Sequence, residues 1–402
     1  MKILVLNSGS SSVKYKLLNL QGSEATTMAE GGVEKIGLPG GFLKYKRADG
    51  SKEIVELGQI DHQAAIKAIL ANLTDPNVGC IKSYDEIDAV GHRVVHGGEK
   101  FSASVLINDE VKDKIRECYD IAPLHNPANM TGIEAITALM PNVPQVGVFD
   151  TAFHQTMPAK AFMYAIPYKY YTEDGVRRYG FHGTSHRYVS GEVCKFLGVS
   201  PEGKRIVTCH VGNGASMAAI VDGKCIDTSM GLTPTEGLMM GSRVGDIDAG
   251  ALTYLMTKHN LSAGELQTIL NKESGVSGVS GVSSDMREID AAIAAGNERA
   301  ALALDMYILR LVKYLGAYIA EMGGVDIIVF TGGVGENQAH VREEVCKQFK
   351  FIGLEIDKAV NDATHGTEAK ISTADSKVTV CVIPTDEELM IARDTEAIVD
   401  AL

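Results

Sequence analysis

Residues 205–229 read RIVTCHVGNGASMAAIVDGKCIDTS, three short apolar runs separated by two turn signals. The run Ile206–Cys209 predicts a strand, and the run Met217–Val221 predicts a second one. An Asp-Gly turn at 222–223 leads into a third short strand at 224–227, because this dipeptide favours a tight hairpin. The stretch therefore predicts a three-stranded antiparallel unit.

The polar segment His210–Ala215 is predicted to be the loop between the first two strands. Because Gly212 and Gly214 carry no Cβ, their backbone N–H groups can approach an anion such as a phosphate closely. An ordinary hairpin turn is the alternative.

The N-terminus repeats this pattern: the apolar run Ile3–Leu6 leads into Asn7–Ser12 and back out through Val13–Leu18. Two similar hairpins, each at the start of one half of the chain, favour two related lobes. Their loops are expected to face one another across a cleft.

The bulk composition sets limits on the class of protein. A chain of 402 residues with 45% hydrophobic content is long enough for two domains. A formal net charge of -13 disfavours nucleic acid and anionic membranes as partners. The 7 cysteines are scattered, as expected for reduced thiols in a cytosolic protein, and no apolar run is long enough to span a membrane.

Two charged residues follow predicted strands. The strand 87–90 leads into Gly91–Gly98, which holds Arg93, and the strand 145–149 ends at Asp150. Ligands of open α/β sheets sit beyond the carboxyl ends of strands. A buried structural role remains open for Arg93, and a helix or turn cap for Asp150.

The second half of the chain offers further candidates. His182 and His186 have the i, i+4 spacing of zinc ligands but lack the glutamate of HExxH, so an anion-binding His182 at a helix start is the better interpretation. Residues 275–284 have the composition of a flexible linker. The strand 327–330 and the following glycine turn predict a nucleotide-grade site, although neither dinucleotide nor P-loop fingerprints are present. Thr385 and Glu388 predict a capping box for the last helix.

Six segments, in order along nearly the whole chain, resemble the acetokinase family of the acetate and sugar kinase, Hsp70 and actin superfamily. They read NSGSSSVK from Asn7, GHRVVHGG from Gly91, FDTAFHQTMP from Phe149, YGFHGTSH from Tyr179, HVGNG from His210 and FTGGVGEN from Phe330. One such motif would be weak evidence, whereas six in family order are specific.

The resemblance implies an α/β fold with two actin/Hsp70-like (ribonuclease H-like) lobes of duplicated ββαβα type and ATP in the cleft between them. Residues 1–150 and 386–402 are the expected N-terminal lobe, and 151–385 the expected nucleotide-binding lobe. It also implies reversible ATP-dependent phosphorylation of acetate to acetyl phosphate. A magnesium ion (manganese as an alternative), a homodimer and a cytoplasmic location complete the expectation.

The resemblance also implies residue roles. Arg93 corresponds to the acetate-binding arginine, Asp150 to the catalytic acidic residue, and His182 and Arg243 to transition-state stabilisers. The pocket for the methyl group corresponds to Val95, Leu124, Phe181 and Pro234. The magnesium-associated positions correspond to Asn7 and Glu387. The phosphate-loop positions are Lys14, His210, Val211, Gly212, Asn213 and Gly214. The adenosine positions are Asp285, Met286, Arg287, Gly333, Val334, Gly335, Glu336 and Asn337.

The chain departs from the family pattern at four positions: Ser8 replaces alanine, Thr235 replaces a common leucine, and Ser242 and Val244 flank Arg243 in place of threonine and serine. The changes at Thr235 and Val244 affect the expected shape of the pocket.

The chemistry needs no general base, because acetate is already ionised at neutral pH. The barrier is repulsion between two anions and charge on a loose phosphoryl group, which cationic donors offset. We therefore hypothesise that Asp150 orients magnesium through water. The alternatives are a propionate or butyrate kinase and, in another class, a nucleotide-gated binding protein of the Hsp70/actin type.

Overall fold

The computed structural model describes residues 1–402 and divides the chain into two compact units. Unit 1 comprises Met1–Gln155 and Asp386–Leu402, and unit 2 comprises Thr156–Thr385. Unit 1 is therefore assembled from the two ends of the chain. No helix combines the length and the apolar character needed to cross a membrane.

The boundary between unit 1 and unit 2 follows Gln155, five residues later than the expected residue 150. Residues 151–155 belong to unit 1 because they form hydrogen bonds with Gly97 and Gly98. The Gly97 N–H donates to the Thr151 hydroxyl at 3.0 Å. The Gln155 amide donates to the Gly98 carbonyl at 3.2 Å.

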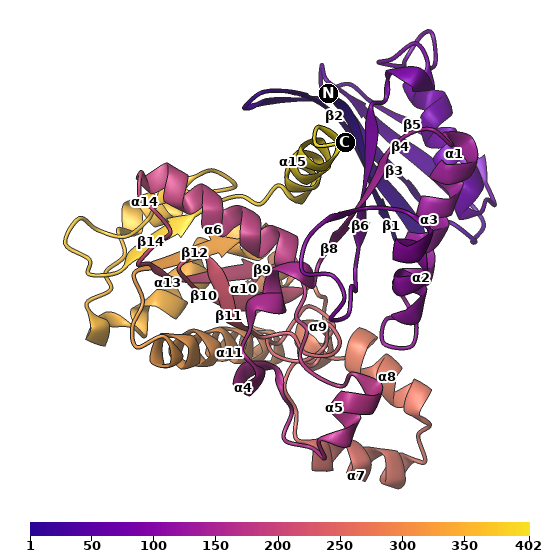
Figure 1. The fold of residues 1–402 in the computed structure, drawn as a ribbon. Helices are drawn as coiled ribbons and strands as arrows, with labels where there is room; N and C mark the ends of the chain where they lie inside the picture. The colour runs from indigo at the N-terminus through magenta and orange to yellow at the C-terminus, as the bar shows by residue number, and fades with distance from the viewer. The chain divides into compact units, whose positions relative to one another are not determined.

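Unit 1 is built on an eight-stranded sheet with the order β5-β4-β3-β2-β1-β6-β8-β7 (Figure 1). Its strands are β1 (Lys2–Ser8), β2 (Ser12–Gln21), β3 (Glu24–Glu34), β4 (Gly41–Arg47), β5 (Lys52–Gly58), β6 (Ala89–Val94), β7 (Val105–Leu106) and β8 (Gln145–Phe149). β1 is antiparallel to β2 and parallel to β6, which is parallel to β8. The ends of β6 and β8 therefore lie side by side.

Helices cover both faces of the central strands of unit 1. They are α1 (His62–Leu73), α2 (Asp109–Glu117), α3 (Asn126–Leu139) and α15 (Glu387–Val399), with short 3-10 turns at Tyr84–Glu86 and Ala152–Thr156. Alternate residues of β1 point to opposite faces. Leu4 and Leu6 pack in the core under α1 and α3, whereas Ile3 and Val5 pack with Ile391 of α15. A Cβ on Gly91 of β6 would lie 2.6 Å from Ile391 Cγ2, so only glycine allows α15 this close.

Unit 2 repeats the pattern with a six-stranded sheet in the order β11-β10-β9-β12-β14-β13. Its strands are β9 (Arg205–Val211), β10 (Ala215–Val221), β11 (Lys224–Thr228), β12 (Ile327–Thr331), β13 (Ala369–Lys370) and β14 (Thr379–Val382). β9 is antiparallel to β10 and parallel to β12, which is parallel to β14. The strands β10-β9-β12-β14 thus match β2-β1-β6-β8, and the expected duplication is confirmed.

Helix α6 (Gly183–Leu197) lies on one face of this sheet and α11 (Glu298–Glu321) on the other (Figure 1). Helices α5 (Lys169–Asp174), α7 (Ala249–His259) and α8 (Ala263–Lys272) lie away from the sheet (Figure 1). The other helices of unit 2 are α4 (Ala159–Phe162), α9 (Gly275–Ser280), α10 (Met286–Ala294), α12 (Gly332–Asn337), α13 (Ala339–Lys347), the 3-10 turn Lys350–Ile352 and α14 (Lys358–Ala363).

Two expectations about local structure were wrong. The glycine-rich stretch expected to be a linker forms helix α9, because Val276 is buried and its N–H donates to the Met240 carbonyl at 2.9 Å. The last helix is capped by Asp386, whose side chain accepts from the Leu389 N–H at 2.9 Å. The Thr385 hydroxyl lies 2.8 Å from Ser185 instead.

Strands also extend further than predicted. Four residues that were expected in loops belong to strands. Asn7 lies in β1, Arg93 in β6, and His210 and Val211 in β9. The loop of the central hairpin therefore shrinks to residues 212–214. Backbone pairing with β10 explains the difference, since Val211 lies opposite Ala215.

Candidate functional site

Arg93 and Asp150 meet at the ends of the parallel strands β6 and β8. Arg93 donates from Nε to one Asp150 oxygen at 3.0 Å and from a terminal nitrogen to the other at 2.6 Å. This planar fork is the strong form of an arginine–carboxylate pair. Asp150 is thus neither a helix cap nor a turn cap, and it supplies the anionic partner that Arg93 requires.

The fork leaves part of Arg93 available. The side chain of Asp150 is 1% exposed and that of Arg93 is 23% exposed. Burial alone would lower the pKa of the Arg93 guanidinium, but the charges of Asp150, Glu387 and Glu388 raise that pKa above its usual value. A third N–H donates to Asn7 Oδ1 at 3.3 Å, so two of the five guanidinium N–H groups remain for another anion.

Asn7 and Glu387 are the two expected magnesium-associated residues. Both belong to unit 1, Asn7 on β1 and Glu387 at the first position of α15. The chain has no group of three or more His, Cys, Asp and Glu side chains able to hold a metal ion by themselves. Magnesium prefers oxygen ligands and usually takes only one or two carboxylates together with water and phosphate. The carboxylate of Glu387 fits such a site, and Asn7 Oδ1, which accepts from Arg93, has one further lone pair for an ion.

The four expected methyl-pocket residues divide between the units. In unit 1, Val95 is buried and its N–H donates to Asn129 Oδ1 at 3.0 Å, whereas the side chain of Leu124 is 57% exposed. In unit 2, Phe181 is buried and Pro234 is half-buried. Asn129 also donates to the Ser8 carbonyl at 2.7 Å, so it fixes Val95 against β1.

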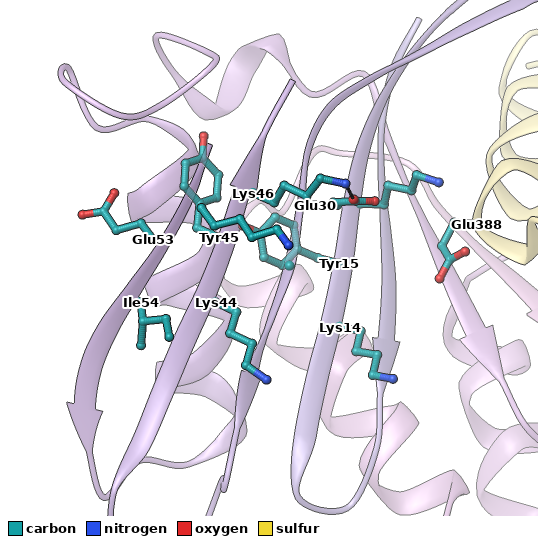
Figure 2. Close-up of a pocket in the computed structure, with 12 residues that line it drawn as sticks. Lys14, Tyr15, Glu30, Lys44, Tyr45, Lys46, Glu53, Ile54 and Glu388 are labelled. Atoms are coloured by element: carbon teal, nitrogen blue, oxygen red, sulfur yellow. Dashed lines mark hydrogen bonds and ion pairs between the residues drawn. The ribbon is translucent and has the colours of Figure 1, made fainter. Parts of the chain in front are cut away.

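Lys14 lines an open cavity of about 590 Å³ in unit 1. The cavity lies against strands β2 to β5 and also contacts Glu388 of α15. In Figure 2 the side chains of Lys14, Lys44 and Glu388 extend on the same side of the sheet. Lys14 lies opposite Asn7 in the β1–β2 register. Lys46 pairs with Glu30 at 2.6 Å, whereas Lys14 and Lys44 form no ion pair. The cavity is therefore cationic near Lys14.

The glycine loop of the central hairpin brings two of the expected catalytic groups together in unit 2. The Gly212 N–H donates to the Gly214 carbonyl at 3.1 Å, which closes the turn. A Cβ on Gly214 would lie 3.6 Å from both Arg243 and His182 Nε2. Two potential donors therefore lie beside the loop where the sequence predicts a phosphate.

His182 has an unusual backbone conformation. It occupies the left-handed region with φ 55° immediately before α6, although it is not glycine. Such conformations are costly and cluster at functional sites. Its ring stacks on His210 with the centroids 4.2 Å apart and 24° between the planes. The stacking holds the imidazole beside the glycine loop.

Arg243 is fixed by a loop that contacts the same hairpin. Its guanidinium donates to the Pro234 carbonyl at 3.0 Å. The Gly241 N–H donates to the Asn213 carbonyl at 2.9 Å, and a Cβ on Gly241 would lie 1.9 Å from Asn213 Oδ1. Glycine is therefore required at 241, where the loop that carries Arg243 crosses the hairpin loop 212–214.

Thr235 and Ser242, two of the departures from the family pattern, both form hydrogen bonds to Asn271 of α8. The Thr235 hydroxyl donates to Asn271 Oδ1 at 2.6 Å, and the Ser242 hydroxyl donates to the Asn271 carbonyl at 3.1 Å. These bonds brace the loop that carries Arg243.

The expected adenosine residues occupy two helix starts. Asp285 caps α10, and Arg287 pairs with it at 2.6 Å while 84% exposed. Residues 333–337 lie in α12, which directly follows β12. The carboxylate of Glu336 accepts from the N–H groups of Gly332 at 2.9 Å and Thr385 at 3.2 Å. Its side chain therefore braces the turn.

A fully buried arginine supports this turn from behind. Arg342 donates to the Gly335 carbonyl at 3.0 Å and, through its other nitrogens, to Asn361 and Thr364. Burial lowers the pKa of Arg342 to about 10. Carbonyl and amide oxygens, and not a carboxylate, accept the hydrogen bonds of this guanidinium.

Arg342→Met is expected to lower the free energy of unfolding by about 3 kcal/mol, because buried carbonyls lose their charged donor. Thermal unfolding measures the effect. The control Arg116→Met removes only exposed ion pairs and should change stability by less than about 1 kcal/mol. An unchanged melting temperature for Arg342→Met would contradict the prediction.

Several polar residues that hold the site together could not be recognised as such from the sequence: Asn129, Ser185, Thr208, Ser216, Asn271 and Arg342. Ser185, Thr208 and Ser216 lie within the quoted segments, but nothing in their spacing indicates which partners they contact. The alternation of lysines on β4 was the one available signal for Lys44.

Known proteins resemble the chain along its whole length. The model of the acetokinase family matches residues 2–393. The acetate kinase of Phocaeicola vulgatus is 64% identical over 400 residues, which is 100% of both chains. The crystal structure of Porphyromonas gingivalis acetate kinase matches with a TM-score of 0.95 at 58% identity, covering 99% of each chain. A propionate kinase from Francisella tularensis matches with a TM-score of 0.91 at 41% identity, covering 98% of this chain and 99% of the other. The chain therefore belongs to the acetokinase family.

Proposed function

We propose that this chain transfers the γ-phosphoryl group of ATP to acetate, giving acetyl phosphate and ADP, and that the reaction runs in both directions. The observation that carries the proposal is the Arg93 guanidinium, which is held in place by Asp150 and Asn7 and keeps two N–H groups for a carboxylate. Relatives that share 58–64% of the sequence and carry the name acetate kinase support it.

In this proposal Arg93 holds acetate through the end of its guanidinium. A carboxylate oxygen attacks the γ-phosphorus, and the bond between that phosphorus and the departing ADP oxygen breaks. No proton needs to be removed, because acetate is ionised. Arg243 and His182 donate to the phosphoryl oxygens at Gly214, where charge is spread in the transition state.

The other expected site residues complete the proposal. Magnesium, when bound, would offset the charge of the phosphates; Asn7 and Glu387 would hold it, with Asp150 orienting it through water. Manganese, with similar oxygen ligands, is the alternative ion. Lys14 and residues 210–214 would contact the phosphates, and residues 285–287 and 333–337 would contact adenosine. Val95, Leu124, Phe181 and Pro234 would accommodate the methyl group.

We also propose a homodimer in the cytoplasm. The dimer is an expectation from the family resemblance, and two-fold dimers are the commonest closed assemblies. All seven cysteines are free, and most are buried. Reduced thiols and ATP as a co-substrate suit the cytoplasm.

Propionate is the second candidate acceptor, favoured by the likeness to the Francisella tularensis propionate kinase. One added methylene changes discrimination by only about 1–3 kcal/mol. Propionate is therefore expected to be a poorer substrate than acetate, and butyrate poorer still.

A direct assay tests the proposed function. Purified protein with magnesium and ATP is expected to release ADP in proportion to added acetate, with acyl phosphate trapped as the hydroxamate. Parallel reactions contain propionate, butyrate or no acid. Equal ADP release without any acid would contradict the proposal and favour a nucleotide-gated binding protein. A higher kcat/KM for propionate than for acetate would reassign the acceptor.

A further inference from the structure

A chain of three hydrogen bonds runs beneath His182 in unit 2. Thr208 Oγ1 on β9 lies 2.7 Å from His186 Nδ1 on α6. His186 Nε2 lies 2.8 Å from Ser216 Oγ on β10. Ser216 Oγ lies in turn 2.8 Å from His182 Nδ1. Thr208, His186 and Ser216 are all 0% exposed, so water does not reach the two bonds between them.

The donor and acceptor of each of these three hydrogen bonds follow from counting protons. Thr208 Oγ1 has one proton and no other side-chain hydrogen bond, so its O–H donates to His186 Nδ1. A neutral His186 then carries its proton on Nε2 and donates to Ser216. Complete burial favours the neutral ring over the charged one. Ser216 has accepted at its oxygen, so its own proton goes to His182 Nδ1.

The reverse direction is disfavoured. His182 would donate to Ser216, Ser216 to His186, and His186 to Thr208. The Thr208 proton would then remain buried without an acceptor, which is a costly arrangement for a hydroxyl.

We propose that Thr208, His186 and Ser216 are positioning residues that fix His182 as the tautomer protonated on Nε2. This inference rests on the proposed function, because it concerns the donor to the transferred phosphoryl group. His182 Nε2 lies 3.6 Å from the Cβ position of Gly214, on the side of the ring that faces the glycine loop. With Nδ1 accepting from Ser216, Nε2 carries the hydrogen and donates. In the other tautomer its lone pair would face the phosphoryl oxygens and repel them.

The fixed tautomer has an electrostatic advantage over a permanently charged imidazole. His182 stacks on His210 at 4.2 Å, and two imidazolium charges at this distance would repel. His210 Nδ1 is bonded separately to Ser185 at 2.7 Å, so the second ring has its own hydroxyl partner. A neutral donor thus fits the stacked pair.

Nitrogen-15 NMR of the complete protein labelled at histidine tests the proposal without substrate. The His182 signal is assigned by its loss in His182→Gln. The wild type is expected to show a protonated Nε2 and an unprotonated Nδ1. A protonated Nδ1 with an unprotonated Nε2 would overturn the proposal, and this measurement needs no variant of Thr208 to fold.

Kinetics of two variants give a second readout. Thr208→Val removes the hydroxyl that donates to His186. Because this hydrogen bond is lost, kcat is expected to fall about tenfold. The KM values for acetate and ATP should stay within about twofold of wild type. Thr208→Ser keeps the hydroxyl and should restore kcat. Unchanged kcat and an unchanged His182 signal in Thr208→Val would overturn the proposal. Absence of acetate-dependent ADP release in the wild type would instead refute the proposed function, whereas the tautomer is read independently of it.

Discussion

Replacing Arg243 with alanine is expected to lower kcat by roughly 10²–10³-fold and to change the KM values for acetate and ATP by less than about threefold. The reason is that Arg243 lies beside Gly214 together with His182, where a donor contacts charge that develops only during transfer. Its position depends on the Pro234 carbonyl and on the loop that crosses Asn213. Steady-state kinetics with both substrates varied measure the effect.

Arg243→Lys is the matched control for charge. It keeps a cation but loses the planar fork, so kcat should recover only partly. If Arg243→Ala instead raised the ATP KM as strongly as it lowered kcat, Arg243 would serve ground-state binding, and its proposed role would have to be abandoned.

Arg93→Ala is expected to raise the acetate KM about 100-fold, because the carboxylate loses a charge-assisted pair of hydrogen bonds. The same change leaves the buried carboxylate of Asp150 without its partner. Removal of one member of a buried ion pair typically costs about 3–5 kcal/mol of stability. Kinetics and thermal unfolding of the variant measure the two effects.

A double variant separates binding from stability. Arg93→Ala combined with Asp150→Asn removes the unpaired buried charge, so much of the lost stability should return while the acetate KM stays high. Asp150→Asn alone keeps the arginine and should bind acetate better than either variant that lacks it. Recovery of the acetate KM in the double variant would show that Arg93 acts through folding and not through contact with the substrate.

Motifs with strong backbone requirements could be predicted from the sequence. The central hairpin and β8 lie close to their expected positions, and a helix starts directly after His182 as expected, because glycine turns and apolar periodicity are local signals. These features depend on residues within one or two turns of each other.

Long-range partners could not be predicted in this way. Arg93 and Asp150 are 57 residues apart, and only the parallel pairing of β6 and β8 makes them neighbours. The hydroxyls of Thr208 and Ser216 gain a function only because two adjacent strands face α6. Helix α9 formed despite its linker-like composition, since the Met240 carbonyl accepts from Val276. In each case tertiary contacts decided between alternatives that were locally equivalent.

Helix α15 sets the order in which the chain can mature during translation. Its residue Ile391 packs against Ile3 and Val5, yet it leaves the ribosome almost four hundred residues after them. Until α15 has been made, one apolar face of the first sheet is without its cover, whereas all strands of the second sheet have already been made. The nascent polypeptide therefore exposes an aggregation-prone hydrophobic surface for most of its synthesis. A product truncated before α15 would expose that surface permanently.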